Sequence, residues 1–482
     1  MLTTSSALFW LVLFSALFAA AGMLYARRSS HTLEDYIVAR NTQGSVATLL
    51  TLLASSLGAW ILFSPAQAAT WGGLAAVIGY SLGSMSPRLA MIPLGKRMRE
   101  LIPRGHSLTE FLMARYGRSM YVLALFIMMF YMFIAMTAEI TAIARLVTLL
   151  APVPLWVTAA IVMGFTLLYT SYGGLKASIF TDKVQVIIIV PLLLALVFIG
   201  WKASGGIAHV EQALHLKAPQ LLDLSDPVGI KAGLTFFVAI LLTGIFHQGN
   251  WQRIYSARDT RTMRNGFLLG GVLVVPFIFV MGLFGLAFVG LEPEGDSSVA
   301  LFSVVMPQIP LWLAIALIPL GLALVMSSAD TTISAVSSIV AVDVGRLLPA
   351  TGTATLMRLS RWLILLLAIP VMIVAAQGYS VLYLFLLADL LCAAAAFPVF
   401  YGLFSAKHSG FDATVATIGG LVASLYLFPM PGEPMTYLLE SFLMAALVPV
   451  LVTLLLRIVR PVRTSFDLQS LAGTIRRLDS SL

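Results

Sequence analysis

A stripe of hydroxyl side chains lies within a membrane-length apolar segment near residue 330. Four hydroxyls spaced at i, i+4, i+7 and i+11 share one face of a helix, and a carboxylate lies beside them: Ser327, Thr331, Ser334, Ser338 and Asp330. Polar groups facing hydrocarbon are costly, so we expect this stripe to face a partner helix, water or an ion. Hydroxyl, carbonyl and carboxylate oxygens suit a small hard cation much better than a soft metal.

The composition places this stripe in a membrane protein. The 482 residues are 60% hydrophobic and only 10% charged, whereas soluble proteins are usually about 25% charged. The mean hydropathy is +0.97. The single cysteine, Cys392, excludes a disulfide framework and a cysteine-based metal site. No large soluble segment and no GxxxxGK[ST] motif is present, so we expect neither an enzyme nor an ATP-driven pump.

Apolar stretches long enough to cross a bilayer recur along the whole chain. They predict an all-α polytopic membrane protein with about 13 transmembrane helices. The predicted spans are 7–25, 45–70, 72–95, 120–150, 154–171, 184–201, 230–250, 266–290, 311–341, 362–377, 380–404, 412–429 and 436–456.

The lysines and arginines predict the orientation. One alternate set of loops carries nearly all of them: 27–28, 96–118, 176–183, 253–264, 346–361, 407 and the tail from 457. The positive-inside rule therefore places the N-terminus outside and the C-terminus in the cytoplasm. The net charge of +8 is an orientation signal and not a nucleic-acid patch. The first span has no positive n-region, so it is expected to be a retained helix and not a cleaved signal.

Proline and glycine interrupt several spans. Pro65 lies in the second span, Gly244 and Gly249 in the seventh, and Pro319 in the ninth. Transporters use such breaks to expose backbone groups near the midplane, although ordinary helix bending is the alternative for any one proline.

Several motifs together resemble the sodium:solute symporter family, which includes proline, pantothenate, sialic acid and sugar symporters. They occur in family order over most of the chain. The matching pieces are Asp35-Tyr36 with Arg40; Ala54-Ser-Ser-Leu57-Gly-Ala-Trp60; Thr109-Glu110 with Arg115-Tyr116-Gly117; Tyr172-Gly173-Gly174 with Thr181-Asp182 and Gln185; Trp251-Gln252-Arg253; and Met326-Ser-Ser-Ala-Asp330 ending at Asp343.

This resemblance implies a leucine-transporter-type fold built from two inverted repeats of five helices. The predicted repeats are 45–229 and 230–404. Residues 1–44 precede them as an extra helix and cytoplasmic loop, and residues 405–482 follow as two helices and a short basic tail. The predicted topology agrees, because the second span starts in the cytoplasm and the seventh starts outside.

The resemblance also implies a sodium site between the first and eighth core helices. Matched motif to motif, backbone carbonyls of Ala54, Leu57 and Leu324 and the hydroxyls of Ser327 and Ser328 would be the ligands. Neutral oxygens can replace part of the water shell of the ion. The alternative is that both serines only donate hydrogen bonds to carbonyls of their own helix.

Some relatives bind a second sodium, and the corresponding positions here are Asp182, Asp330 and Thr331, close to Ser327. The alternative interpretation is that the two aspartates are charges at the cytoplasmic mouth that attract sodium or pair with Lys183. A protonatable aspartate would also allow proton coupling, because burial raises the pKa of a carboxyl group.

The family places its substrate beside the broken first and sixth core helices. Candidate contacts are Ser55, Ser56, Trp60, Glu139, His247, Gln248 and Asp389. Glu139 and Asp389 are intramembrane carboxyls that could meet an amine, pair with Arg145, or accept hydrogen bonds from backbone. His247 is either a proton-sensitive binder or gate, or a solvated side chain at a helix end.

The predicted function is sodium-coupled import of a small polar, amino-acid-like solute across the plasma membrane (the bacterial inner membrane) by alternating access. Ser56 stands where proline symporters of the family carry an aspartate, which disfavours proline, and the binding spans are poor in Asn and Gln, which disfavours sugar. The alternatives are proton coupling, a urea or monocarboxylate substrate, a sensor module or a channel. No organic cofactor or nucleic acid is expected; the predicted partners are sodium, solute and lipid, with a monomer or a weak homo-oligomer.

Overall fold

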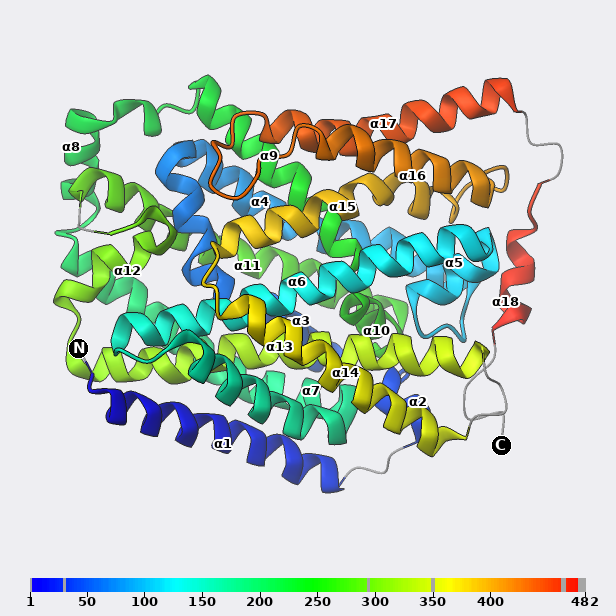
Figure 1. Cartoon of the computed structure of the whole chain (residues 1–482), viewed down its shortest axis with the longest axis horizontal. Helices are drawn as coiled ribbons and strands as arrows, with labels where there is room; N and C mark the ends of the chain where they lie inside the picture. Colours follow the sequence, from blue (N-terminus) through cyan, green and yellow to red (C-terminus); the bar gives the residue numbers. More distant parts are fainter. Residues whose placement is uncertain (1, 29–31, 293–294, 348–351, 461–464, 476–482) are drawn as a thin grey trace.

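The computed structural model describes residues 2–28, 32–292, 295–347, 352–460 and 465–475, and these residues form a bundle of helices with no named strand (Figure 1). The helices are α1 (Thr4–Arg28), α2 (Leu33–Ile37), α3 (Ser45–Ala54), α4 (Ser64–Leu101), α5 (Leu108–Tyr116), α6 (Arg118–Leu150), α7 (Leu155–Ala203), α8 (Ile207–Lys217), α9 (Pro227–Thr243), α10 (Gln248–Ser256), α11 (Thr260–Leu291), α12 (Ala300–Val305), α13 (Leu311–Leu347), α14 (Thr353–Ala375), α15 (Val381–Tyr401), α16 (Gly410–Leu425), α17 (Leu438–Val459) and α18 (Leu471–Thr474).

Two of the longest helices, α4 and α7, are each bent at a glycine with left-handed backbone. Gly73 has φ 60° and Gly174 has φ 54°. A Cβ at Gly73 would lie 2.8 Å from Leu221 Cα, so both the conformation and the close contact require glycine. The two kinks fall where the sequence predicts one span to end and the next to begin.

Among the described residues, nine segments are long and apolar enough to cross a membrane, and four shorter helices are apolar. The shorter ones include α3 and α16, which the sequence predicts as parts of spans. Length and composition alone therefore support fewer spans than thirteen, and the count of thirteen and the orientation of the termini stay predictions.

Two helices of the core are interrupted at their middles. Between α3 and a short 3₁₀ turn at Ala59–Leu62, residues 55–58 belong to no helix, and Gly58 is extended at φ −80° and ψ 172°. Between α9 and α10, the 3₁₀ turn Gly244–Phe246 ends at His247, which is also extended. These interruptions expose backbone groups in the interior. The second lies at Gly244, as the sequence predicts, whereas Pro65 lies in the first turn of α4 and not in the first interruption.

Small residues allow the core helices to pack closely. α4 lies against α9 and α11, and a Cβ on Gly79 would overlap the backbone of Gly233. Such small-residue contacts are typical of helices within membranes, where packing replaces the hydrophobic effect between helices.

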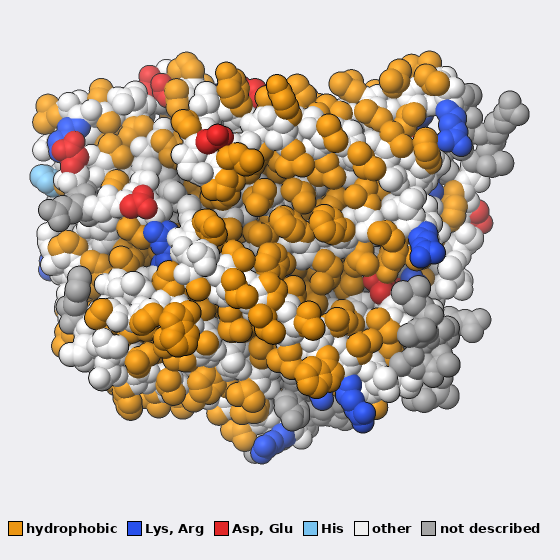
Figure 2. Space-filling model, in the orientation of Figure 1, with side chains coloured by type: hydrophobic (Ala, Val, Ile, Leu, Met, Phe, Trp, Pro, Cys, Tyr) orange, Lys and Arg blue, Asp and Glu red, His pale blue; other side chains and the backbone are white. Residues whose placement is uncertain are grey.

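The surface has the character of a lipid-facing belt. Hydrophobic side chains cover most of the face in Figure 2, and large ones such as Ile187 (74% exposed) and Phe198 (72%) point outward. This is a multi-pass membrane protein, because a soluble protein rarely exposes so much apolar surface. In Figure 1 the N-terminus, α8 and α12 lie at one end of the bundle and α5 and α18 at the other. Parts of the predicted basic loop 346–361 and of the basic tail lie outside the described residues.

Candidate functional site

The break in the first core helix is held open by a carboxyl group from α6. The backbone N–H of Ala59 donates a hydrogen bond of 2.7 Å to Glu139 Oε2. A Cβ on Gly58 would overlap the Glu139 carboxyl group, so glycine at this position lets the carboxyl reach the backbone. Glu139 therefore satisfies a backbone donor. The alternative pairing with Arg145 is wrong, because Arg145 donates to Ser298 at 2.8 Å and lies 3.9 Å from Asp296.

Oxygens from this break and from α13 lie together. Ser327 Oγ is 3.1 Å from the carbonyl of Ala54 and 3.0 Å from that of Leu324. Its hydroxyl has one hydrogen, so it can serve only one of the two carbonyls at a time. Leu57, the remaining predicted ligand, is fully buried in the same break.

Ser328 differs from its neighbour. Its hydroxyl oxygen is buried and has no hydrogen-bond partner among the described residues. Leaving a hydroxyl unpaired in an apolar interior costs about 1–3 kcal/mol, so such a group usually has a ligand or water as its partner. The donor set therefore suits a small hard cation, since all of its oxygens are neutral and one of them is unsatisfied.

A cavity of about 150 Å³ adjoins this oxygen cluster. Six of the seven predicted substrate contacts line it: Ser55, Ser56, Trp60, Glu139, His247 and Asp389. Ser328 and Thr331 line the same cavity. The candidate ion site and the candidate solute site therefore share a wall.

The side chain of Arg88 on α4 brings a positive charge to the lining of this cavity. One of its terminal nitrogens donates to the carbonyl of Ser84 and the other to Ser56 Oγ, while Nε is buried with no partner. All of these partners are neutral. The acidic side chain of Asp389 on α15 also lines the cavity, and it forms no ion pair with a described residue.

Four aromatic rings complete the lining of the cavity: Trp60, Tyr80, Tyr131 and Phe385. Trp60 stacks on Tyr80 with 5.8 Å between ring centroids. His247 begins α10, where its Nδ1 accepts the N–H of Gly249 at 3.0 Å. His247 thus caps the start of α10 and lines the cavity, where it is half-buried.

Gln248 does not reach the cavity, and its prediction as a substrate contact is wrong. It is fully buried. Its amide donates to the carbonyl of His106 at 2.8 Å and accepts from the N–H of Leu108 at 3.2 Å. Residue 248 follows His247 on the first turn of α10, so its side chain points away from the cavity and anchors the loop before α5.

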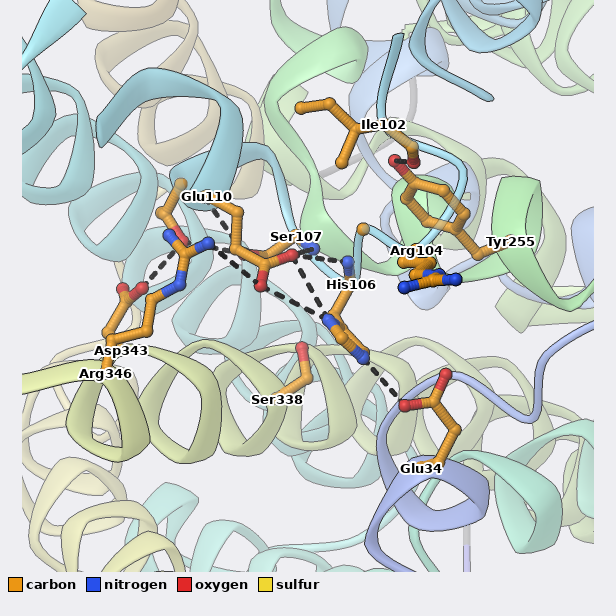
Figure 3. Close-up of polar contacts among 12 residues, drawn as sticks. Glu34, Ile102, Arg104, His106, Ser107, Glu110, Tyr255, Ser338, Asp343 and Arg346 are labelled. Carbon is orange, nitrogen blue, oxygen red and sulfur yellow. Dashed lines mark hydrogen bonds and ion pairs between the residues drawn. The ribbon is translucent and has the colours of Figure 1, made fainter. Parts of the chain in front are cut away.

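That loop carries an ionic cluster, in which His106 lies between Glu34 and Glu110 (Figure 3). His106 Nε2 is 2.7 Å from Glu34, and Arg346 lies 3.4 Å from Glu110. Burial lowers the pKa of His106, but the charges and hydrogen bonds of Glu110 and Glu34 outweigh it and raise the pKa to about 9. For Glu34 the directions are reversed: burial raises the pKa of its carboxyl group, but His106 and Arg40 outweigh burial and lower the pKa to about 2.

The positions predicted for a second sodium surround an arginine. Arg253 Nη2 lies 3.0 Å from Asp182 and 2.8 Å from Thr331 Oγ1, and its Nε donates to Thr51 at 3.0 Å. Asp182 also accepts from Thr51. The predicted alternative pairing of Asp182 with Lys183 is wrong, because the adjacent side chain is on another face of α7 and Arg253 occupies the ion-pair position.

Asp330 is enclosed by hydroxyl donors. Tyr169 donates at 2.7 Å, Ser178 at 2.7 Å and Thr181 at 2.9 Å. Asp330 is fully buried, so the interpretation of this carboxylate as a charge at an open mouth is wrong. The same carboxylate faces α7, while the hydroxyl stripe of α13 faces elsewhere.

The stripe runs along α10. Gln252 Nε2 donates to the hydroxyl of Ser334 at 3.4 Å, and Gln248 Nε2 donates to the hydroxyl of Ser338 at 3.3 Å. With Arg253 and Thr331, these contacts pair one face of α10 with one face of α13. Only the first hydroxyl, Ser327, meets the break that carries Ala54.

The model of the sodium:solute symporter family matches residues 36–422. The chain belongs to the sodium:solute symporter family. It is similar to a spermidine transporter of Candida albicans, at 24% identity over 84% of this chain and 77% of the relative. It is also similar to the sodium/pantothenate symporter of Escherichia coli, at 26% identity over 54% of this chain and 56% of the relative. The match spans little more than half the length of that symporter.

The fold of this symporter-family chain also matches a solved structure. A sodium-coupled sialic acid symporter, in a substrate-bound outward-open state, superposes with a TM-score of 0.74 at 18% identity, covering 96% of this chain and 99% of that one. The shared fold is the leucine-transporter type. Members of this family are transporters, and the chain is a transporter and not an enzyme.

Two arginines of this transporter were missed as site residues in the sequence. Arg253 stands in the Trp251-Gln252-Arg253 motif, and Arg88 stands inside the predicted span 72–95. An arginine within an apolar span is a functional signal in itself, and Arg88 carries that signal beside Pro87. Nothing in the sequence shows that Arg253 turns toward Asp182, 71 residues away.

Proposed function

We propose that this chain imports a small zwitterionic solute in symport with sodium, by alternating access across the plasma membrane. The observation that supports it best is the pair of opposite charges, Arg88 and Asp389, facing one small cavity. Asp389 is buried and Arg88 is half-buried, and neither has a charged partner among the described residues. A solute with a carboxylate and an ammonium group would neutralise both.

The carboxylate of the solute would bind Arg88. A planar guanidinium can donate two parallel hydrogen bonds to a carboxylate, and Arg88 Nε has no partner among the described residues. The ammonium would face Asp389, with the rings of Trp60 and Tyr131 providing cation–π surface. The cavity volume of about 150 Å³ suits a small solute.

Sodium would bind to the carbonyls of Ala54, Leu57 and Leu324 and the hydroxyls of Ser327 and Ser328. The unpartnered hydroxyl of Ser328 supports this assignment. Because Ser328 also lines the cavity, an ion bound there would stiffen one wall of the solute site, and the affinities of the two ligands would rise together.

The proposal includes the topology. The two broken helices would belong to inverted repeats 45–229 and 230–404, between the segments 1–44 and 405–482, with the N-terminus outside. The breaks at 55–58 and 244–247 support this pairing, because each lies within the first helix of its repeat. The inward sodium gradient would then drive uptake.

Uptake into proteoliposomes tests the proposal. Radiolabelled small zwitterions, a monocarboxylate, urea and spermidine are compared with external sodium or choline, after a thermal-shift screen of the same solutes. We expect uptake of a zwitterion that needs sodium. Equal uptake in choline would contradict sodium coupling, and sodium-driven uptake of spermidine or urea alone would contradict the zwitterion.

Arg88→Met should weaken binding of the carboxylate-bearing solute by about 10–100-fold, since a hydrogen bond to a charged group contributes about 1.5–3 kcal/mol. Arg258→Met is the matched control, because Arg258 is exposed and pairs only with the adjacent Asp259. Unchanged affinity in the Arg88 variant would remove Arg88 from the solute site.

A further inference from the structure

We propose that residues 465–475 form a strap that restrains the opening of the cytoplasmic side and so slows the turnover of the transporter. The inference rests on the alternating access and the topology proposed above, in which this end of the bundle faces the cytoplasm. The strap lies outside residues 36–422, the part of the chain that the family model matches. None of the motifs shared with the family therefore accounts for it.

The strap has one apolar face, and that face is buried. Leu471 and Ile475 are 0% and 2% exposed, and Phe466 and Leu468 are partly buried against the same hydrophobic core. Removing large apolar side chains from water favours the docked segment. The residues between these four are exposed: Asp467, Gln469, Ser470, Ala472, Gly473 and Thr474.

The strap docks at one end of the bundle, where α18 contacts α5 and α4 (Figure 1). Its first part is also tied to the turn between α15 and α16, because the backbone N–H of Phe466 donates to the carbonyl of Ala406 at 2.9 Å. The strap therefore joins three parts of the chain that are far apart in sequence.

Arg115 of α5 connects the strap to the end of α15. Its Nε donates to the carbonyl of Gly402 at 3.3 Å, and its Nη2 donates to that of Ser405 at 2.7 Å. The negative end of a helix favours a cation in this position. The ring of Phe466 lies over the guanidinium, with 4.6 Å between Cζ and the ring centroid. This cation–π contact also shields the two hydrogen bonds from water, so docking of the strap strengthens the connection between α5 and α15.

The strap contacts lie across a boundary that alternating access has to open. On one side α4 lies against α9 and α11, and on the other side α5 leads directly into α6, which lies against α13 and α15. Arg97 of α4 crosses the same boundary, where its Nε donates to the carbonyl of Leu403 at 3.2 Å. When the two groups of helices rock apart at this end, α4 has to move relative to α5. A strap docked on both helices resists that motion and slows release into the cytoplasm.

Hydrogen–deuterium exchange and uptake, both measured on the reconstituted full-length chain, test the inference. Leu471→Asn/Ile475→Asn makes the buried face of the strap polar, and Ala472→Asn/Thr474→Asn is the matched control on its exposed face. In the first variant we expect the amides of α5 to exchange at least about tenfold faster than in the wild type. The initial rate of sodium-driven uptake of radiolabelled glycine and alanine should rise at least about twofold. The control should match the wild type in both measurements.

Equal exchange in the variant and the control would overturn the strap as a restraint. Faster exchange with unchanged or slower uptake would overturn its effect on turnover. A wild type without sodium-dependent uptake would instead contradict the proposed function, and the exchange measurement would still decide whether the strap restrains α5. If the double variant does not fold, Phe466→Ala, which removes only the ring over Arg115, should give a smaller rise in both measurements.

Discussion

Two neighbouring parts of α13 present similar oxygens but are used differently. Around Ser327 and Ser328 the oxygens are neutral, and one hydroxyl has no partner among the described residues. One turn further on, Asp330 and Thr331 carry more polar character but are enclosed by protein donors. The number of polar atoms therefore does not identify an ion site. What distinguishes the first part is a group of neutral oxygens that includes one unpartnered hydroxyl.

The largest expected effect is a loss of stability when the ion pair beside Asp330 and Thr331 is broken. Asp182→Ala should destabilise the protein by about 3–5 kcal/mol, because removing one partner leaves the buried Arg253 uncompensated. Thermal unfolding of the purified protein measures this. Asp182→Ala/Arg253→Met should recover part of the loss, and a single Asp182→Ala variant as stable as wild type would show that the pair is not structural.

The cluster around His106 should make stability depend on pH without touching the ion site. The pKa of His106 rises from 6.5 to about 9, so its contribution is complete below about pH 6.5 and is lost as pH rises through 9. We expect a loss of roughly 3 kcal/mol across that interval. Glu34, with its pKa lowered from 4.5 to about 2, acts oppositely: its contribution is complete above pH 4.5 and is lost as pH falls through 2.

The check is thermal unfolding between about pH 6 and 9.5. His106→Gln should flatten the dependence between pH 6.5 and 9. The same slope in wild type and variant would assign the pH dependence to another group.

Ser328→Ala should raise the sodium concentration for half-maximal uptake about tenfold, which corresponds to about 1.4 kcal/mol of lost binding. Stability in the absence of sodium should not fall, because the hydroxyl has no protein partner among the described residues. Ser334→Ala is the matched control on the same helix, where the hydroxyl faces Gln252. Equal sodium dependence in the two variants would remove Ser328 from the ion site.

Thr331→Val should give the smallest change in sodium dependence, less than about threefold, together with a loss of stability of about 1 kcal/mol. Its hydroxyl accepts a hydrogen bond from Arg253, so the substitution removes a structural contact. Sodium titrations of uptake and thermal unfolding measure the two effects. A larger shift in sodium dependence than that of Ser328→Ala would reverse the comparison between the two parts of α13.

The sequence predicts much of this structure because its signals are local. Apolar length predicts the helices, and Gly244 marks the break between α9 and α10, whereas Pro65 lies in the first turn of α4, after the other break. Ser327 and Ala54 are linked across the bundle only through the family motifs, and the structure brings them to 3.1 Å. These site assignments depend on motifs and on the family resemblance. They do not predict the direction in which a side chain points.

The direction of a side chain on an irregular segment is not encoded locally. Gln248 and His247 are adjacent, yet only His247 lines the cavity. Arg253 and Glu139 find partners that are far away in sequence, Asp182 and the N–H of Ala59. Which buried charges pair with each other follows from the packing of helices, and a single sequence does not contain that packing explicitly.

The most direct test of the comparison is a high-resolution density map of the protein prepared in sodium and, in parallel, in choline. We expect one sodium-dependent peak, bounded by the carbonyls of Ala54 and Leu324 and the hydroxyls of Ser327 and Ser328, with Arg253 still paired to Asp182. A sodium-dependent peak beside Asp182 and Thr331, or none at Ser328, would contradict the division of α13 into an ion-binding part and an enclosed structural part.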